Sequence, residues 1–317
     1  MSTAASLQPE RPTGCSRLIT QSAPSSDWDL ARSRDICRQL ELGDIILFPQ
    51  TPIAIPPADR ELLLGRKQSS SAYHKNIAYR PAEDRISGLD ASEQAEAAEL
   101  RRILHEYSQR SVEFLSRFLL PYGGRWKLDF ASFRPVEEKG RPARLHARND
   151  LLHFDSFPTR PTNGARILRF FTNINPAQNR VWLTSQTFQS FGPHFARKTG
   201  LLPSFRRPLS RAVRSMARLL LLPGSHRPPY DELMHRCHNA MKEDSAFQHT
   251  APKLRWEFPP SSSWMVFTDC VSHAVLSGQY ALEQTLLIPQ SALVEAARSP
   301  LVILESLAGC SLTLNLL

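Results

Sequence analysis

The stretch WMVFTDCVSHAVLSGQYALEQTLLIP, residues 264–289, contains three short β-rich runs and determines the expected fold class. Ser277 and Gly278 separate two of these runs, as in a tight hairpin turn. The runs are apolar and contain β-branched or aromatic residues, which is typical of strands that pack in a sheet. The strands expected here cover residues 264–268, 271–276 and 280–288.

Similar runs precede this stretch from Trp126 onward and are separated by Pro, Gly and Asn. Further strands are therefore expected at 126–134, 151–155, 165–174 and 180–184. Several short strands that follow a helical N-terminal part favour an α+β protein with a β-sandwich or barrel core.

The N-terminal part is expected to be mainly helical. Residues 92–119 place apolar side chains at helical spacing with charged residues between them, which predicts a long amphipathic helix. A shorter helix is expected at 29–41 and a strand at 44–48. Residues 1–28 are rich in Ser, Thr, Pro and Ala and are interpreted as a flexible tail.

The composition excludes several classes of protein. The chain has 317 residues and a net charge of +9, and no apolar run approaches the roughly 20 residues of a membrane span. The N-terminus lacks the apolar centre of a secretory signal, and the five cysteines form no C-x-x-C pair. We therefore expect a globular cytoplasmic protein with reduced thiols.

A possible metal site is formed by His153, Asp155 and His273. In a strand, His153 and Asp155 point to the same face because they are two residues apart. Two imidazoles and one carboxylate make the facial triad that binds Fe(II) and leaves coordination positions open. Zinc is a weaker alternative, because the cysteines lack a suitable spacing.

The triad is not specific by itself. A chain with ten His and 30 acidic residues is expected to contain an H-x-D match by chance, and a lone His in an apolar strand is often a core residue. A rival pair, His235 and His238, lies three residues apart in an amphipathic helical pattern. We interpret this pair as exposed histidines on a helix face.

Three longer segments resemble the Kdo 3-hydroxylases. They are YHKNIAYRP at 73–81, the segment from ASFRP to TNINP at 131–176, and FPPSSSWMVFTDCVSHAVLSGQYALEQT at 258–285. The resemblance covers most of residues 40–310. It implies an Fe(II)/2-oxoglutarate-dependent oxygenase with a double-stranded β-helix (jelly-roll, cupin-like) core, N-terminal helices and a basic helical insertion at about 192–250. Residues 29–317 would then form a single oxygenase domain.

The resemblance also implies a reaction. His153, Asp155 and His273 match the iron ligands of the family and would be its catalytic centre. The enzyme would use Fe(II), 2-oxoglutarate and O2 to hydroxylate C3 of Kdo in Kdo–lipid A, forming Ko in the lipopolysaccharide inner core. Its expected location is the cytoplasm, as a peripheral protein on the cytoplasmic face of the inner membrane.

The 2-oxoglutarate partner departs from a common pattern of the wider superfamily. Many members carry an arginine about ten residues past the distal histidine, but the strand at 280–288 has neither Arg nor Lys, and Gln284 occupies this neighbourhood. Arg169 and Arg166 lie on a strand shortly after the H-x-D motif. We expect Arg169 to pair with the carboxylate, because a guanidinium can bind a carboxylate through two bonds. The two arginines are three positions apart in the strand, so their side chains point to opposite faces and only one of them can point inward.

The positive charge is concentrated in one segment. Residues 156–230 contain 12 basic and no acidic residues, so the rest of the chain is slightly acidic. Within it, a basic stripe at helical spacing could bind an anionic membrane or the phosphorylated acceptor. The residues expected to bind substrate or membrane are Arg160, Arg207, Arg211, Arg214 and Arg218.

Other functions remain open at this point. The chain could be a 2-oxoglutarate oxygenase with another anionic substrate, or a non-enzymatic basic protein with a cupin-like fold. Nucleic acid is not an expected partner, because the basic segment 206–227 lacks interleaved aromatic residues. The sequence does not indicate an oligomeric state.

Overall fold

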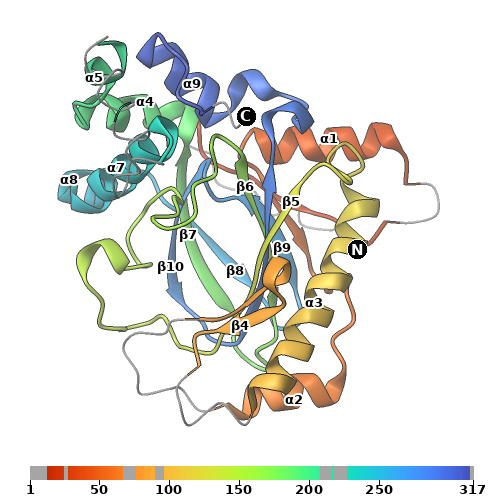
Figure 1. Cartoon of the computed structure of the whole chain (residues 1–317). Coiled ribbons are helices and arrows are strands. Elements are labelled where there is room, and N and C mark those ends of the chain that lie inside the picture. Colours follow the sequence, from red (N-terminus) through yellow and green to blue (C-terminus); the bar gives the residue numbers. More distant parts are fainter. Residues whose placement is uncertain are drawn as a thin grey trace, which may run out of the picture.

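The computed structural model describes residues 13–24, 28–66, 76–89, 96–207, 216 and 227–314. Two sheets face each other in the centre of the molecule (Figure 1). The larger sheet has the strand order β1-β2-β9-β6-β11-β5-β3-β4, and the smaller sheet has the order β10-β7-β8. The pair β1–β2 is parallel, and the other pairs are antiparallel.

The strands are β1 (Leu18–Thr20), β2 (Ile45–Phe48), β3 (Ile77–Arg80), β4 (Arg85–Ser87), β5 (Lys127–Arg134), β6 (Arg166–Asn173), β7 (Arg180–Thr187), β8 (Leu254–Phe258), β9 (Ser263–Phe267), β10 (Val271–Ser277) and β11 (Ala281–Ile288). The α-helices are α1 (Leu30–Glu41), α2 (Pro57–Gly65), α3 (Ala97–Phe118), α4 (Phe188–Lys198), α5 (Leu202–Arg206), α7 (Pro229–Glu243), α8 (Ser245–Thr250) and α9 (Pro300–Ala308). The 3-10 turns are η1 (Pro81–Glu83), η3 (Leu145–Ala147), η4 (Gln290–Ala292) and η5 (Ala296–Arg298).

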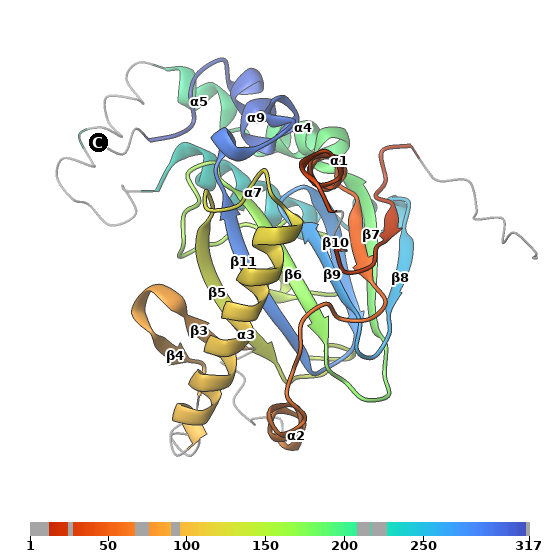
Figure 2. The ribbon, with the colours of Figure 1, turned by 90° about the vertical axis from the view of Figure 1, so that its right-hand side faces the viewer.

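Helix α3 lies across the outer face of the larger sheet (Figure 2). Its apolar stripe is buried, and Phe114 packs against Phe48 of β2 and Phe170 of β6. The charged residues of the helix remain exposed or half-buried, as the sequence pattern predicted. The α3 helix therefore seals one side of the sheet and leaves its other side to face β7 and β10.

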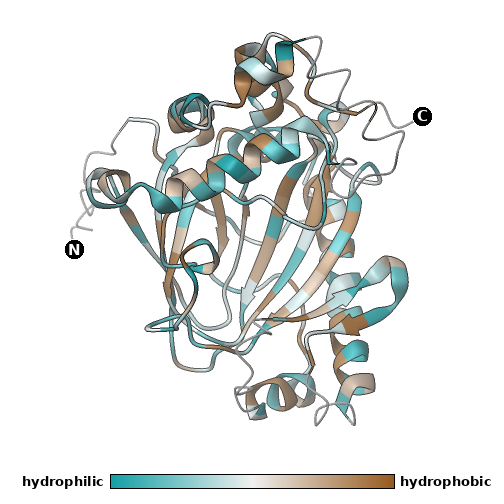
Figure 3. Cartoon of the chain, turned by 60° about the vertical axis from the view of Figure 1, so that its left-hand side comes forward, coloured by the Kyte–Doolittle hydropathy of each residue, from teal (hydrophilic) through white to brown (hydrophobic). Residues whose placement is uncertain are grey.

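The space between the sheets is partly filled by aromatic side chains. Trp264 stacks on Phe258 and Phe171, and Trp182 packs edge-on against the same cluster. Hydrophobic and hydrophilic residues form alternating bands along the strands, since successive side chains point to opposite faces (Figure 3). This apolar layer forms one wall of the cavity described below.

Most sequence-based expectations for the fold are confirmed. The α+β class, the two N-terminal helices and the strand after the first helix are present. Within the described part of 192–250 the chain is helical, in α4, α5, α7 and α8. Three basic residues expected to bind membrane or acceptor, Arg211, Arg214 and Arg218, lie outside the described residues. Among the described residues, no helix combines the length and apolar character needed to cross a bilayer.

Three expectations were wrong. The turn at Ser277 and Gly278 does not close a hairpin, because β10 pairs with β7 in the smaller sheet and β11 pairs with β5 and β6 in the larger sheet. Residues 151–155 are not a strand, because within this stretch only His153 forms a bridge. The tail expected at 1–28 contains β1, which pairs with β2 and is fixed by an ion pair between Arg17 and Asp44. A short strand that supplies two apolar residues to an existing edge has too little periodicity to be recognised in the sequence.

Candidate metal centre and cofactor pocket

Backbone hydrogen bonds bring the two histidines of the predicted triad together. The His153 amide donates to the His273 carbonyl over 3.1 Å, and the His273 amide donates back over 3.0 Å. His273 belongs to β10, whereas His153 lies in an irregular segment that forms an isolated bridge with this strand. The same segment accepts a second backbone bond at the Asn149 carbonyl, from the Val275 amide over 2.8 Å. The Asp155 amide donates to the Thr268 carbonyl over 2.8 Å, which fixes the third member of the triad.

The side chains of the triad converge on one point. In each imidazole, Nδ1 bonds to a backbone carbonyl, of Leu151 at 2.7 Å for His153 and of Val271 at 2.9 Å for His273. This leaves Nε2 of the two rings 3.6 and 3.9 Å from Oδ1 of Asp155. All three potential ligand atoms lie within 4.8 Å of one another.

The protonation states suit a divalent metal ion. Burial lowers the pKa of both His153 and His273, so their Nε2 lone pairs are available at neutral pH. Burial alone would raise the pKa of Asp155, but Arg169 and His153 hold it well below its usual value. Two neutral imidazoles and a carboxylate form the donor set of a non-haem Fe(II) site, so these residues could hold that ion.

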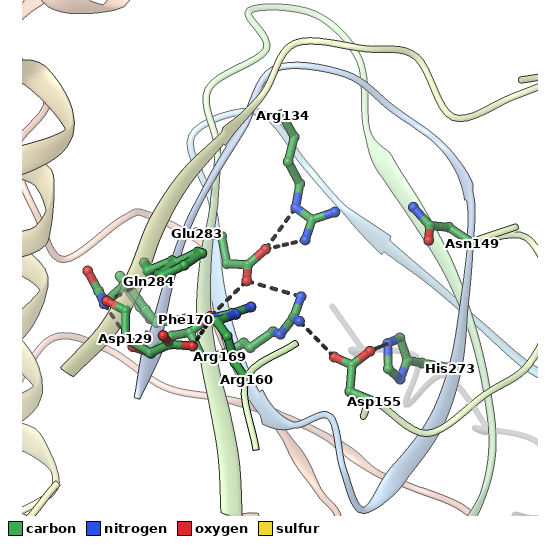
Figure 4. Close-up of polar contacts among 12 residues, drawn as sticks. Asp129, Arg134, Asn149, Asp155, Arg160, Arg169, Phe170, His273, Glu283 and Gln284 are labelled. Carbon is green, nitrogen blue, oxygen red and sulfur yellow. Dashed lines mark hydrogen bonds and ion pairs between the residues drawn. The ribbon is translucent and has the colours of Figure 1, made fainter. Parts of the chain in front are cut away.

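A network of buried ion pairs extends from the triad (Figure 4). Arg169 places Nη2 3.1 Å from Oδ2 of Asp155 and Nη1 3.0 Å from Oε1 of Glu283. The other oxygen of Glu283 accepts from Arg134, with Nε at 2.8 Å. Arg169 therefore orients the carboxylate oxygen that does not face the histidines.

The triad opens into a cavity of about 150 Å³ whose lining includes Arg134, Arg169 and Arg180. Arg180 is fully buried, and its Nη1 donates to the Gly278 carbonyl over 2.9 Å. Its Nε and Nη2 have no hydrogen-bond partner among the described residues. Burial lowers the pKa of Arg180 to about 10, so the guanidinium stays charged at neutral pH. The cavity thus holds a buried cation with free donor atoms.

Apolar side chains form the opposite wall of this cavity. Trp182 stacks against the His273 ring with centroids 5.2 Å apart, and Phe171 and Val275 complete the wall. A cavity with a buried ion site, charged donors and an aromatic wall can exclude water from a reaction at the metal.

Two of the predicted cofactor-binding residues lie elsewhere. Arg166 points to the other side of β6, where it pairs with Asp269 at 2.8 Å and lies over the Phe267 ring. Gln284 faces away from Glu283 on β11, and its amide donates to the Thr285 carbonyl over 2.8 Å. Neither residue lines the cavity, so their contacts do not support the predicted cofactor role.

Sequence reasoning missed three charged residues of this site, Arg134, Arg180 and Glu283. Arg134 ends β5 and Arg180 begins β7, so both lie at strand ends, where parity is hard to assign from the sequence. Glu283 was hidden inside a strand whose eight residues are all buried. A charged residue inside an apolar strand could have indicated a buried ion pair, since buried charges are usually paired.

His238 also differs from its interpretation as an exposed residue. Its ring lies 5.0 Å from that of His153, and its Nδ1 bonds to the Phe154 carbonyl at 2.7 Å. Burial lowers the pKa of His238 to about 4. This histidine therefore supports the backbone between two members of the triad.

A buried facial triad beside an arginine-lined cavity, between two facing sheets, is characteristic of non-haem Fe(II) oxygenases. Residues 26–311 match the family described as 3-deoxy-D-manno-oct-2-ulosonic acid (Kdo) hydroxylase. The chain belongs to this family of Fe(II)/2-oxoglutarate-dependent dioxygenases.

Solved structures of the Kdo hydroxylase KdoO are similar to this chain over most of its length. The complex of KdoO with α-ketoglutarate and Fe(III) is 31% identical, with a TM-score of 0.80 over 94% of this chain and 97% of that one. The cobalt(II) complex is 31% identical, with a TM-score of 0.82 over 94% and 98%. The complex with succinate and Fe(III) is 30% identical, with a TM-score of 0.80 over the same shares. No curated protein matches the chain.

Proposed function

We propose that this enzyme hydroxylates C3 of Kdo in a Kdo–lipid A acceptor and forms Ko, using Fe(II), 2-oxoglutarate and O2 on a double-stranded β-helix core. The observation that carries the proposal is the convergence of His153, Asp155 and His273 within 4.8 Å beside the arginine-lined cavity. The family supports a Kdo-containing substrate. The C3 position and the lipid A acceptor come from the resemblance of the sequence blocks.

The three triad residues would hold the metal through Nε2 of the two histidines and Oδ1 of Asp155. Bound Fe(II), together with 2-oxoglutarate and O2, supplies the oxidising power that transfers one oxygen atom to the sugar. Arg169 keeps Asp155 ionised and fixes the direction of its carboxylate. Trp182 and Phe171 exclude water from the cavity and thereby protect the reaction from side products.

The cosubstrate 2-oxoglutarate would bind through the arginines of the cavity. Arg169, the expected partner, lies in the cavity but already pairs with Asp155 and Glu283, leaving only its Nε without a partner among the described residues. Arg180 has two such free donor atoms and no ion pair shorter than 4.0 Å within the described part of the chain. We therefore assign Arg180 as the principal partner of the distal carboxylate, assisted by Arg169.

The reaction can be tested with purified enzyme, Fe(II), 2-oxoglutarate and a Kdo-containing lipid A precursor in air. Succinate should form in step with acceptor that has gained one oxygen atom, and product analysis should place the hydroxyl at C3. His153→Ala should abolish both products, whereas His194→Ala, an exposed histidine of α4, should retain them. Succinate formation without change to any Kdo acceptor would contradict the proposed substrate.

Membrane association is a separate proposal. We infer a peripheral cytoplasmic enzyme whose acid-free segment at 156–230 binds the anionic surface that carries the acceptor. Arg207, the described residue of the proposed stripe, is exposed after α5. Co-sedimentation with anionic vesicles should fall in the double variant Arg211→Glu/Arg214→Glu and with added salt. Binding that is insensitive to salt would contradict this inference.

A further inference from the structure

A second cavity of about 480 Å³ lies at the other end of the strands that form the metal pocket. Its walls come from the start of β5, the η1 turn, Leu287 of β11 and the segment 159–161 that follows the H-x-D motif. We name it the β5 cleft. Neither the metal triad nor the three arginines of the cofactor pocket line it.

The central residue of the β5 cleft is Arg160, which is held in one orientation by three contacts. Its guanidinium carbon lies 3.9 Å from the centre of the Phe130 ring and 4.1 Å from that of Phe157. Its Nη1 pairs with Asp129, which is almost fully buried. Its side chain keeps an exposed fraction of 30%. Nε and Nη2 have no hydrogen-bond acceptor within the described ranges, so this fixed cation has donor capacity left for a ligand.

Two further cations reach the same cleft. Lys127, at the start of β5, is exposed and forms no ion pair within the ranges that the structure describes. Arg80 lies 5.0 Å from the centre of the Phe130 ring, and its ion pair with Glu83 is long, at 3.4 Å. Glu83 pairs more closely with Arg85, at 2.7 Å. The β5 cleft therefore has an excess of positive charge.

The β5 cleft is connected to the metal pocket through shared side chains. Phe157, which contacts Arg160, also lies under Arg169, with the guanidinium carbon 5.4 Å from the ring centre. On β11, Glu283 and Thr285 share one face, as their 3.0 Å hydrogen bond shows, and Leu287 continues that face into the cleft. Four strand residues span about 13 Å, since each adds about 3.3 Å.

We propose that the β5 cleft binds an anionic group of the acceptor glycolipid, a carboxylate or a phosphate, next to the sugar that is hydroxylated at the metal. The inference rests on the proposed function and extends it. Arg160 provides the oriented donors, Lys127 provides the mobile charge, and Phe130 and Phe157 provide a rigid base. An anion held here would fix which sugar of the acceptor reaches the metal pocket, so the cleft sets the position of hydroxylation.

The test compares Lys127→Gln with Lys139→Gln, a matched change at an exposed loop lysine outside the cleft. A second variant, Arg160→Gln/Asp129→Asn, removes this half-buried ion pair without leaving an unpaired charge. For each variant, the Kd of the acceptor is measured with metal-free protein, and KM values are measured for acceptor and 2-oxoglutarate. Thermal unfolding shows whether a variant is folded.

Lys127→Gln and the double variant should each raise the acceptor Kd and KM by about tenfold, the loss expected for one hydrogen bond to a charged group. The KM for 2-oxoglutarate and all values of Lys139→Gln should stay unchanged. An unchanged acceptor Kd in folded variants would overturn the proposal. If the wild-type enzyme bound the acceptor but did not oxidise it, the proposed function would fail while the Kd values still tested the cleft.

Two altered acceptors identify the source of the anion. One lacks the lipid phosphates, and the other lacks any acidic sugar beyond the one to be hydroxylated. If the tenfold penalty of Lys127→Gln disappears with the first, the cleft binds a phosphate, and if it disappears with the second, the cleft binds a carboxylate. A full penalty with both acceptors would overturn the proposal, because neither a phosphate nor the carboxylate of a neighbouring sugar would then occupy the cleft.

Discussion

Strand β6 carries two buried arginine–aspartate pairs that look alike in the sequence but lie in different surroundings. Arg169 and Asp155 are 3.1 Å apart beside two imidazoles and a cavity. Arg166 and Asp269 are 2.8 Å apart on the opposite side of the strand, against Phe267 in a packed core. Arg169 lies three positions after Arg166, and this odd spacing turns the two side chains to opposite faces.

The comparison shows that a buried ion pair is not by itself a sign of a functional site. Both pairs contain nearly or fully buried groups, and both leave donor atoms without a partner among the described residues. The difference is the neighbourhood, because only Arg169 touches a carboxylate that faces two neutral histidines. Whether an arginine of β6 contributes to the metal site therefore depends on which face of the strand carries it and not on its charge.

The largest effect that would sharpen this comparison is expected from Asp155→Ala. Loss of a metal ligand should reduce succinate formation to background, exceeding the roughly 10–100-fold cost of losing an outer partner. The variant should also lose its bound iron, measured by elemental analysis, while its circular dichroism stays native. Asp35→Ala, at an exposed position of α1, is the control. Normal iron content in Asp155→Ala would refute the assignment of this ligand.

The Arg166→Met substitution should lower the free energy of unfolding. Removing one partner of a buried ion pair typically costs about 3–5 kcal/mol, because the other charge stays buried. Urea unfolding should show this loss relative to Arg117→Met, where the arginine is 70% exposed. The iron content of the folded fraction should remain at the wild-type level. Loss of iron without loss of stability would place Arg166 in the metal site after all.

The Arg169→Met substitution should weaken the binding of iron. Without its guanidinium, Asp155 loses both orientation and the charge that keeps its pKa low. Iron affinity and turnover should fall by about 10–100-fold, the usual cost of an outer partner of a ligand. Titration of the metal-free protein with Fe(II) under anaerobic conditions measures the affinity. Equal iron affinities in Arg166→Met and Arg169→Met would contradict the inference that only the Arg169–Asp155 pair supports the metal site.

The smallest of these effects is expected from Arg180→Lys. A lysine keeps the charge but lacks the planar fork, so the KM for 2-oxoglutarate should rise by about tenfold. Gln284→Met, on the opposite face of β11, should leave this KM unchanged. Steady-state assays over a range of 2-oxoglutarate concentrations separate the two variants. Equal KM values for Arg180→Lys and wild type would exclude Arg180 as the carboxylate partner.

The sequence was sufficient for features that depend on local periodicity. The stripe of α3 and the β-rich runs on either side of Ser277 and Gly278 were recognisable because neighbouring residues determine them. His153, Asp155 and His273 could also be selected, through the spacing of the first two and the family resemblance. The structure brings these three residues together, as that selection predicted.

The remaining features depend on long-range pairing. The sequence could not decide between Arg166 and Arg169, because strand parity alone does not say which face meets the second sheet. Arg180 could not be found, since its role follows from the approach of β7 to the triad and from donors that other elements leave unpaired. The bridge at His153 was mistaken for a strand because one backbone pair produces no periodic pattern.

That bridge has a consequence for biogenesis. His153 and His273 are 120 residues apart in the chain, and their main-chain pair is what aligns the two imidazoles. While the chain is being synthesised, His153 and Asp155 leave the ribosome before His273, so the set of metal ligands is incomplete. Contacts between residues this far apart in the sequence also form slowly. Iron loading must therefore follow translation of β10 and closure of the fold, so an incompletely synthesised chain does not assemble a redox-active centre.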